Sequence, residues 1–260
     1  MQRKQKTRIR LGDRDLAILR FLGEQRMSWL EAIHGRFYSD RTIEAARSTM
    51  RRLCGRAPDY RFVRIDQLDG NRNFFRLTKS GAKLIGAPDA ASQPLGTTAL
   101  LRRYALQWFL DVDGKDARWH CDPRDYPDLF AIEGQRLPRA NFYLEETPGG
   151  TLLGFAVEDY GTDSRRVSRR AVELLERFLK QRWFDELFAA QRFVVTFLVA
   201  TPEKAQAIEQ HFERDAKRRL ASLLRQIPSN TTASVLTDYL VIPGLLTLLP
   251  PTSSANKQGK

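Results

Sequence analysis

Residues 13–53, DRDLAILRFLGEQRMSWLEAIHGRFYSDRTIEAARSTMRRL, contain three successive helical patterns separated by short polar stretches. In each pattern apolar side chains recur every three or four positions, which is the spacing of one helix face. The predicted helices cover residues 13–25, 29–37 and 41–56. Their expected N-caps are Asp13, Ser28 and Asp40, because short polar side chains accept hydrogen bonds from the free amides of a first turn. This order is typical of a helix-turn-helix.

A β-hairpin is predicted directly after these helices. The segments RFVRID (61–66) and NFFRLT (73–78) are rich in β-prone residues, and LDGNR (68–72) supplies turn chemistry between them. A short helix, SGAKLIG (80–86), follows and starts at Thr78 or Ser80. Three helices followed by a two-stranded wing predict a winged helix-turn-helix over residues 1–86.

The stretch APDAASQPLGTT (87–98) has two prolines, one glycine and a single charge, which predicts a linker. Residues 99–250 then combine helical and strand patterns, including the fully apolar segment FVVTFLVA, which is typical of a buried central strand. Helices are expected at 98–112, 164–187 and 202–227, and strands at 118–121, 141–145, 152–158, 193–200 and 234–241. The predicted fold class is α+β with a mixed sheet. Residues 251–260 are expected to be a disordered tail.

The positive charge of the chain is concentrated in its first third. The whole sequence has a net charge of +12, and residues 1–86 alone hold 20 Lys and Arg against 9 Asp and Glu. The remaining residues are nearly neutral, with 23 basic and 22 acidic side chains. A basic domain joined to a neutral one indicates that the first part meets a polyanion, most commonly a nucleic acid.

Several functional classes have no support in the sequence. Cys54 and Cys121 lie far apart without a CxxC pair, and His34, His120 and His211 include no pair at i,i+4 spacing. P-loop, GxGxxG and GxSxG motifs are lacking. No cofactor or metal is therefore expected. Neither a signal peptide nor a membrane span is indicated, so we expect a cytoplasmic protein without a membrane partner.

The third helix and the wing present the candidate DNA-binding side chains. The N-terminal part of such a helix enters the major groove, where arginine reads guanine and hydroxyl side chains contact bases or phosphates. The later arginines and the wing are expected on the backbone or the minor groove. The candidates are Arg41, Thr42, Arg47, Ser48, Arg51, Arg52, Arg64, Asn71 and Arg72. The alternative is a solvated basic face that contacts only protein. The basic stretch QRKQKTRIR (2–10) is either an arm along the DNA backbone or a free terminus.

The segment LGFAVEDYGTDSRRV (153–167) raises the question of catalysis. Glu158 and Asp159 end an apolar strand pattern, and two acids in such a place can hold Mg²⁺ for phosphodiester hydrolysis. The neighbouring strand, however, has Arg139 where such a site needs an aspartate, and Tyr160 stands where a lysine is wanted. The alternative is a strand end whose acids pair with arginines, with Asp163 or Ser164 as helix N-cap.

Four arginines, at positions 165, 166, 169 and 170, cluster at the start of the helix that follows this strand. Basic residues in a first turn oppose the helix dipole. A phosphate bound near the helix N-terminus would explain them, and so would ion pairs with the preceding acids.

These patterns together resemble the replication-relaxation family of plasmids and integrative elements. The similar segments are residues 11–53, FFRLTKSGAKLIG (74–86), VEDYGTDSRRV (157–167) and RFVVTFLVATPEKAQAIEQHF (192–212). The resemblance implies a winged helix joined to a domain similar to restriction-endonuclease folds, in proteins of which some act in conjugative mobilisation. Glu158 matches the family's acid, and Gly161, Thr162 and Ser164 match its turn. Arg139 and Tyr160 depart from the family pattern.

We therefore expect a non-catalytic, sequence-specific protein that binds double-stranded DNA. The resemblance implies a role in a mobile element, either as a transcriptional regulator or as an accessory factor in conjugative transfer or replication, with proteins of those processes as partners. Because dimers read two-fold operators, a homodimer is also considered. The alternatives are a metal-dependent nickase or relaxase using Glu158 and Asp159, and a protein-binding adaptor.

Overall fold

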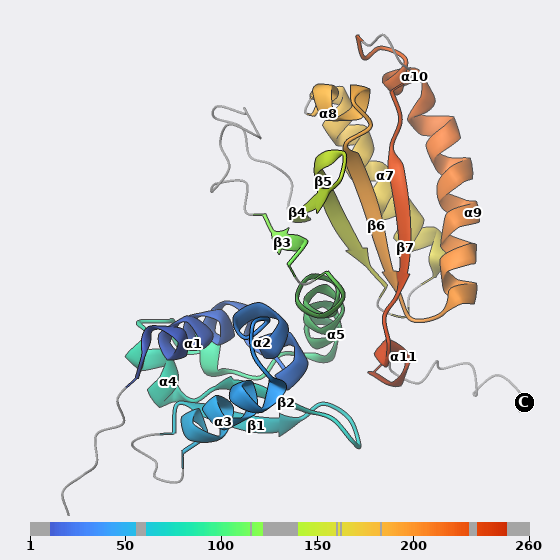
Figure 1. Ribbon diagram of the computed structural model, residues 1–260. Helices are drawn as coiled ribbons and strands as arrows, with labels where there is room; N and C mark the ends of the chain where they lie inside the picture. The colour runs from blue at the N-terminus through green and yellow to red at the C-terminus, as the bar shows by residue number, and fades with distance from the viewer. Residues whose placement is uncertain are drawn as a thin grey trace, which may run out of the picture. The chain divides into compact units, whose positions relative to one another are not determined.

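The computed structural model of the chain describes residues 11–55, 61–114, 116–121, 140–159, 161, 163–182, 184–228 and 233–248. The chain divides into two compact units, residues 1–103 (unit 1) and 104–260 (unit 2). Both units combine helices with a sheet, as Figure 1 shows, so the expected α+β class with a mixed sheet is confirmed. The boundary between the units lies inside one helix rather than in a loop.

Unit 1 begins with three helices, as the sequence patterns indicated. They are α1 (Asp13–Gln25), α2 (Leu30–Phe37) and α3 (Ile43–Leu53). An antiparallel hairpin, β1 (Val63–Gln67) and β2 (Asn73–Leu77), and helix α4 (Lys79–Leu84) follow. The core draws on the apolar face of each helix and on the hairpin. It includes Ile18, Leu22, Ile33, Met50, Leu53, Val63 and Leu77, none of them more than 1% exposed.

The N-caps of these helices differ from the expected ones. Gly12, Trp29 and Thr42 precede the three helices, and none of them makes a side-chain cap hydrogen bond. Ser28 does not cap α2, because its backbone amide and carbonyl pair with Phe75 of β2 in an isolated antiparallel β-bridge beside the hairpin. Only the fourth helix is capped as expected, with Thr78 Oγ1 accepting a hydrogen bond from Gly81 N–H.

The predicted linker at residues 87–98 packs onto unit 1. Its first half forms a 3₁₀ turn, η2 (Asp89–Ser92), in which Ala91 and Ser92 are buried. Arg76 donates a hydrogen bond to the carbonyl of Ser92, and Arg26 donates one to the carbonyl of Gln93 at 3.3 Å. Carbonyls in this polar stretch therefore bind arginines of unit 1, and the segment packs against the helices and hairpin that precede it. Helix α5 (Thr97–Gln107) follows and crosses into unit 2.

Unit 2 is built on a five-stranded sheet in the order β3-β4-β5-β6-β7. The strands are β3 (Arg118–His120), β4 (Asn141–Thr147), β5 (Gly150–Glu158), β6 (Phe193–Val199) and β7 (Leu236–Val241). The first three strands are antiparallel, and the last two run parallel to β5. The helices are α7 (Ser164–Lys180), α8 (Asp185–Ala189), α9 (Pro202–Arg219), α10 (Ala221–Leu224) and α11 (Leu245–Leu248).

Two expected helices of unit 2 are each divided in two. The pattern at 164–187 becomes α7 and α8, because Arg182 and Phe184 adopt left-handed backbone angles that end one helix before the next begins. The turn carries the Phe184 ring into the core, where it lies 5.4 Å from the ring of Phe178. The pattern at 202–227 becomes α9 and α10, which meet at Leu220.

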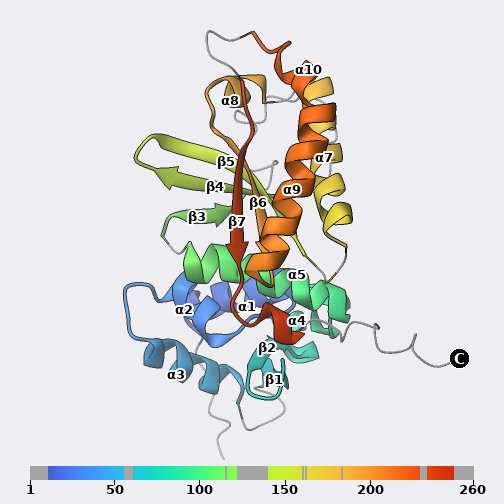
Figure 2. The ribbon, with the colours of Figure 1, turned by 90° about the vertical axis from the view of Figure 1, so that its right-hand side faces the viewer.

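The two faces of this sheet differ in character. Helices α7 and α9 cover one face, where Phe155, Phe178, Phe193 and Phe197 form an aromatic core (Figure 2). The other face is partly polar. There the Tyr143 hydroxyl lies 2.6 Å from Thr196 Oγ1, and its ring packs against Phe109 of the π-helical segment η3 (Trp108–Asp113).

Candidate functional site

Helix α3 presents a polar outer face to solvent. Ala46, Met50 and Leu53 point into the core of unit 1, so the positions between them must face outward. We call this outer surface the α3 face. It comprises Arg41 and Thr42, which precede the helix, and Glu44, Arg47, Ser48 and Arg51 within it; Arg47 is partly buried and the others are exposed. A narrow apolar stripe with a wide polar surface opposite it is the pattern of an amphipathic helix on the surface of a domain.

The turn leading into α3 is held by side chains of the preceding helix. His34 Nε2 lies 2.8 Å from the carbonyl oxygen of Arg41. The Tyr38 hydroxyl donates a hydrogen bond to Thr49 Oγ1 at 2.8 Å, and the Arg14 guanidinium lies over the Tyr38 ring at 4.7 Å. These contacts fix the angle at which α3 leaves α2, so the α3 face is positioned before any partner arrives.

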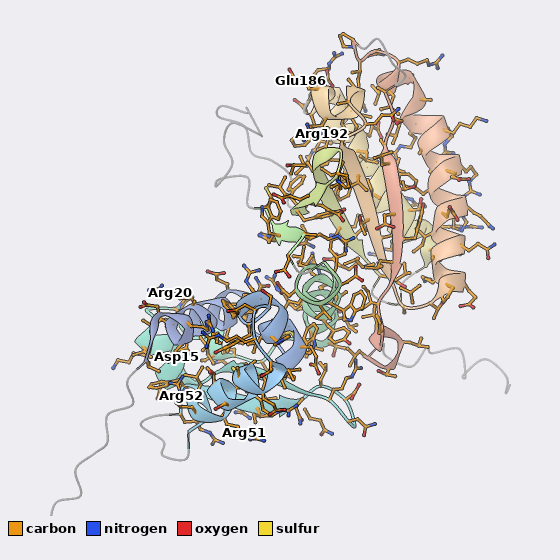
Figure 3. All side chains as sticks on the ribbon, viewed as in Figure 1. Asp15, Arg20, Arg51, Arg52, Glu186 and Arg192 are labelled. Atoms are coloured by element: carbon orange, nitrogen blue, oxygen red, sulfur yellow. The ribbon has the colours of Figure 1, made fainter. Side chains whose placement is uncertain are left out.

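The arginines of the α3 face differ in whether a carboxylate of the protein already pairs with them. Arg47 is ion-paired with Glu44, and Arg41 Nε lies 3.6 Å from Asp40 Oδ2. Arg51 is exposed on the outer side of α3 and has no ion pair within the described part of the chain (Figure 3). The exposed ion pairs of Arg47 and Arg41 each contribute on the order of 1 kcal/mol or less, so a phosphate can replace the carboxylate in either pair.

Arg52 has a different role from its neighbour Arg51. Its Nη1 and Nη2 donate hydrogen bonds to the two carboxylate oxygens of Asp15, at 2.9 and 2.6 Å (Figure 3). The Asp15 side chain is only 6% exposed and also accepts a hydrogen bond from Gly12 N–H at 2.9 Å. Burial alone would raise the pKa of Asp15, but the hydrogen bonds from Arg52 and Gly12 outweigh it and lower that pKa. Arg52 therefore joins α3 to α1, and its guanidinium group is bound inside unit 1.

The arginines of the hairpin are also paired internally. Asp66 binds both Arg64 and Arg76, and Arg76 is itself buried. At the tip, Asp69 accepts hydrogen bonds from the Arg72 side chain and from the amides of Asn71 and Arg72. The Arg72 hydrogen bond lowers the pKa of Asp69 to about 2. The hairpin thus carries less unmatched positive charge than its sequence indicated.

The acids at the end of β5 are buried. Glu158 and Asp159 are each 2% exposed. Asn141 of β4 donates a side-chain hydrogen bond to Glu158, while Asp159 accepts one from Gly161 N–H at 2.9 Å. Lys204 of α9 lies 3.8 Å from Asp159. Both carboxylates therefore have protein partners on neighbouring elements.

These partners differ from the arginines that were expected from the sequence to pair with the two acids. Asp163 caps α7, with its Oδ1 accepting a hydrogen bond from Arg165 N–H at 3.0 Å, so that expectation is confirmed. Asn141 and Lys204 were not indicated as partners, because strand pairing and the helix after β6 bring them to the acids from 17 and 45 positions away in sequence. Arg139, Tyr160 and the N-terminal stretch lie outside the described residues.

Within the described ranges, no group of three or more His, Cys, Asp and Glu side chains is arranged to hold a metal ion. No helix in the same ranges is long and apolar enough to cross a membrane.

Proposed function

The chain matches no family model, no curated protein and no solved structure, so its function is argued from the site itself. From the geometry of its α3 face we propose that unit 1 is a winged helix-turn-helix that binds double-stranded DNA, with α3 in the major groove and the β1–β2 hairpin as its wing. The observation that carries the proposal is the α3 face, a solvent-exposed row of arginines and hydroxyl side chains on a helix whose opposite side is core.

The order of elements supports this assignment. Three helices are followed by an antiparallel hairpin, and a β-bridge from Ser28 to Phe75 ties the segment between α1 and α2 to that hairpin. The segment also holds nearly all the net positive charge of the chain, 20 basic against 9 acidic side chains within residues 1–86. Neutralising several phosphates supplies most of the affinity of such proteins for DNA.

The candidate residues then divide by role. Arg47 and Arg51, with Thr42 and Ser48, are the side chains of α3 that face outward toward bases and phosphates. Arg41 and the wing residues Arg64, Asn71 and Arg72 supply backbone contacts, weakened where an aspartate already holds the arginine. Arg52 is not a DNA contact in this proposal, because its guanidinium binds Asp15.

Unit 2 is proposed to be a nuclease-like domain that has lost catalysis. Its order of helix, three antiparallel strands, helix and parallel strand agrees with the fold that the family resemblance implies. The Glu158 carboxylate accepts a hydrogen bond from Asn141, at the place where a metal site would have a second acid. The whole protein would serve a mobile element as a transcriptional regulator or as an accessory factor in conjugative transfer or replication.

Salt-dependent binding tests the role of α3. Fluorescence anisotropy with a labelled duplex of about 30 base pairs should give an affinity that falls steeply between about 50 and 200 mM salt. Arg47→Ala and Arg51→Ala should each flatten the log–log slope by roughly 0.9, one phosphate contact each. Selection from a random duplex pool should enrich a sequence motif when the wild type is used. Ser48→Ala and Arg47→Ala should each change that motif.

Arg20→Ala is the matched control, because Arg20 is an exposed arginine of unit 1 that lies on α1 (Figure 3). The proposal fails if Arg20→Ala weakens binding as much as Arg51→Ala does. It also fails if the duplex binds with no salt dependence, which would favour a protein-binding adaptor.

A metal-dependent nickase is the second candidate function. The observation that favours it is Lys204 beside Asp159, since a lysine near paired acids can orient an attacking water. Supercoiled plasmid incubated with Mg²⁺ or Mn²⁺ distinguishes the two functions. Nicking that disappears in Glu158→Ala would establish the enzyme, whereas intact plasmid supports the non-catalytic proposal.

A further inference from the structure

A groove in unit 2 is lined almost entirely by arginine. It lies between α7 and α9, which run side by side on one face of the sheet (Figure 2). Its volume is about 330 Å³. Its lining residues are Arg165, Arg169, Arg214, Asp215, Arg218 and Arg219. We call it the α7–α9 groove. It shares none of these residues with the α3 face or with the acids at the end of β5.

The groove has far more positive than negative charge. Five guanidinium groups surround a single carboxylate, Asp215, whose Oδ1 lies 3.7 Å from both Arg214 and Arg218. Arg165 and Arg169 are exposed and have no ion pair with any residue that the structure describes. Like charges gathered in a concave surface raise the local positive potential, and their repulsion destabilises the fold unless an anion binds.

One arginine is already oriented by the protein. Arg219 donates a hydrogen bond from Nε to Glu176 Oε2 at 2.9 Å, and only 32% of its side chain is exposed. The Arg214 and Arg218 side chains are 61% and 75% exposed, and Arg214 Nη2 also lies 2.8 Å from His211 Nδ1. The groove therefore combines an arginine held by a carboxylate with arginines that are largely exposed to solvent.

The spacing of the arginines indicates the class of ligand. Arg165 and Arg169 are one helical turn apart, as are Arg214 and Arg218, which places each pair about 6 Å apart along its helix. Two such rows offer bidentate contacts to more than one phosphate group. No aromatic side chain lines the groove, so it lacks the stacking surface on which bases are read.

We propose that the α7–α9 groove binds the phosphodiester backbone of a nucleic acid without reading its sequence. This gives the protein a second nucleic-acid contact, on unit 2, beyond the DNA site proposed for unit 1. The contact is carried by residues of unit 2 alone, although it shares with the first proposal the expectation that DNA is the partner. It also gives a role to Arg165 and Arg169, two of the four arginines at the start of α7.

Binding by the full chain tests the groove independently of α3. The groove variants are R165A/R169A and R214A/R218A, the α3 variant is R47A/R51A, and the matched control is R177A/K217A, which removes two exposed charges from the same helices outside the groove. Each is titrated by anisotropy against a labelled duplex and a labelled single strand. Each groove variant removes two phosphate contacts, so it should flatten the salt slope by roughly 1.8 with the duplex and roughly 1.4 with the single strand, while the control leaves both slopes unchanged.

The outcomes separate the two proposals. If the groove variants bind like the wild type while R47A/R51A does not, the groove proposal is overturned and the α3 proposal stands. The reverse result overturns the α3 proposal alone. Competition assays add a further test. If inorganic phosphate displaces the single strand at equal total charge, the groove is a site for single phosphates and not for a nucleic-acid backbone. Displacement by poly-glutamate but not by an unlabelled strand would assign the groove to an acidic protein. Circular dichroism of each variant confirms that it is folded.

Discussion

The α3 face and the end of β5 are two places where the sequence concentrates charged residues that could serve a function. Their charged side chains differ in the structure: those of α3 are exposed and those of β5 are buried. On α3, charged side chains lie in solvent, and the pairs they form are short-range and exposed. At the end of β5, two carboxylates are 98% buried and are bound by Asn141, Lys204 and a backbone amide. Charge that is exposed is available to a partner, whereas charge that is buried with protein partners stabilises the fold.

Arg51 and Arg52 show the same difference between adjacent residues. Both belong to the last turns of α3, yet one faces solvent and the other binds a carboxylate that is only 6% exposed. A helix rotates by about 100° per residue, so neighbouring side chains point to different surroundings. An arginine cluster in a sequence therefore overstates the number of arginines that can meet DNA.

The largest effect is expected for Gly154→Ala, on the polar face of the unit 2 sheet. A Cβ at this position would lie 2.4 Å from the ring of Tyr143, its partner across the β4–β5 pair. The buried tyrosine must move and lose its hydrogen bond to Thr196, so unit 2 should lose about 3 kcal/mol of unfolding free energy in urea. Gly149→Ala, in the same hairpin with its nearest neighbour at 3.8 Å, should have little effect. Equal effects would show that the sheet tolerates rearrangement here.

Glu158→Ala directly tests the structural role of the buried acids. It removes the partner of Asn141 and leaves a small cavity, so we expect a loss of about 2 kcal/mol from unit 2. Glu158→Gln should retain much of the packing and cost less. Glu146→Ala, an exposed acid on β4, is the control and should leave the unfolding midpoint unchanged. A more stable Glu158→Ala protein would instead indicate a carboxylate kept for function at the expense of stability.

Arg52→Ala should destabilise unit 1 by about 1.5 kcal/mol, because it leaves the Asp15 carboxylate buried without its bidentate partner. Its partial exposure, 42% of the side chain, keeps the effect at the low end for charged hydrogen bonds. Arg51→Ala should stay within about 0.5 kcal/mol of the wild type. Hydrogen exchange of unit 1 amides measures both, and similar values would remove the distinction between the two arginines.

The pH-dependent contribution of Asp15 to the stability of unit 1 should be smaller still. The pKa of Asp15 is lower in the folded state than its ordinary value of 3.8, so its contribution is fully present above that value. It is lost as the pH falls through the lowered folded-state pKa. Comparing the wild type with Asp15→Asn between about pH 6 and 2 should show the wild-type advantage shrinking in acid. A constant difference would contradict the assignment.

Much of the secondary structure could be predicted from periodicity alone. The pattern at residues 13–25 matches α1 to the residue, and the hairpin and the apolar strand at 193–199 lie where they were expected. The errors lie at helix ends. Short polar residues such as Asp13 and Ser28 can cap a helix or serve another contact, and local sequence does not decide between them.

The sequence by itself determined the two-part organisation, the basic first third and the amphipathic faces, because these depend on composition and on contacts between residues a few positions apart. Only the tertiary structure decided which charges are available. It brought Asp15 to Arg52, Asn141 to Glu158 and Lys204 to Asp159, and it gathered arginines 45 to 54 positions apart into the α7–α9 groove. Burial and pairing come from chain segments that meet only when the elements pack, so no local pattern carries that information.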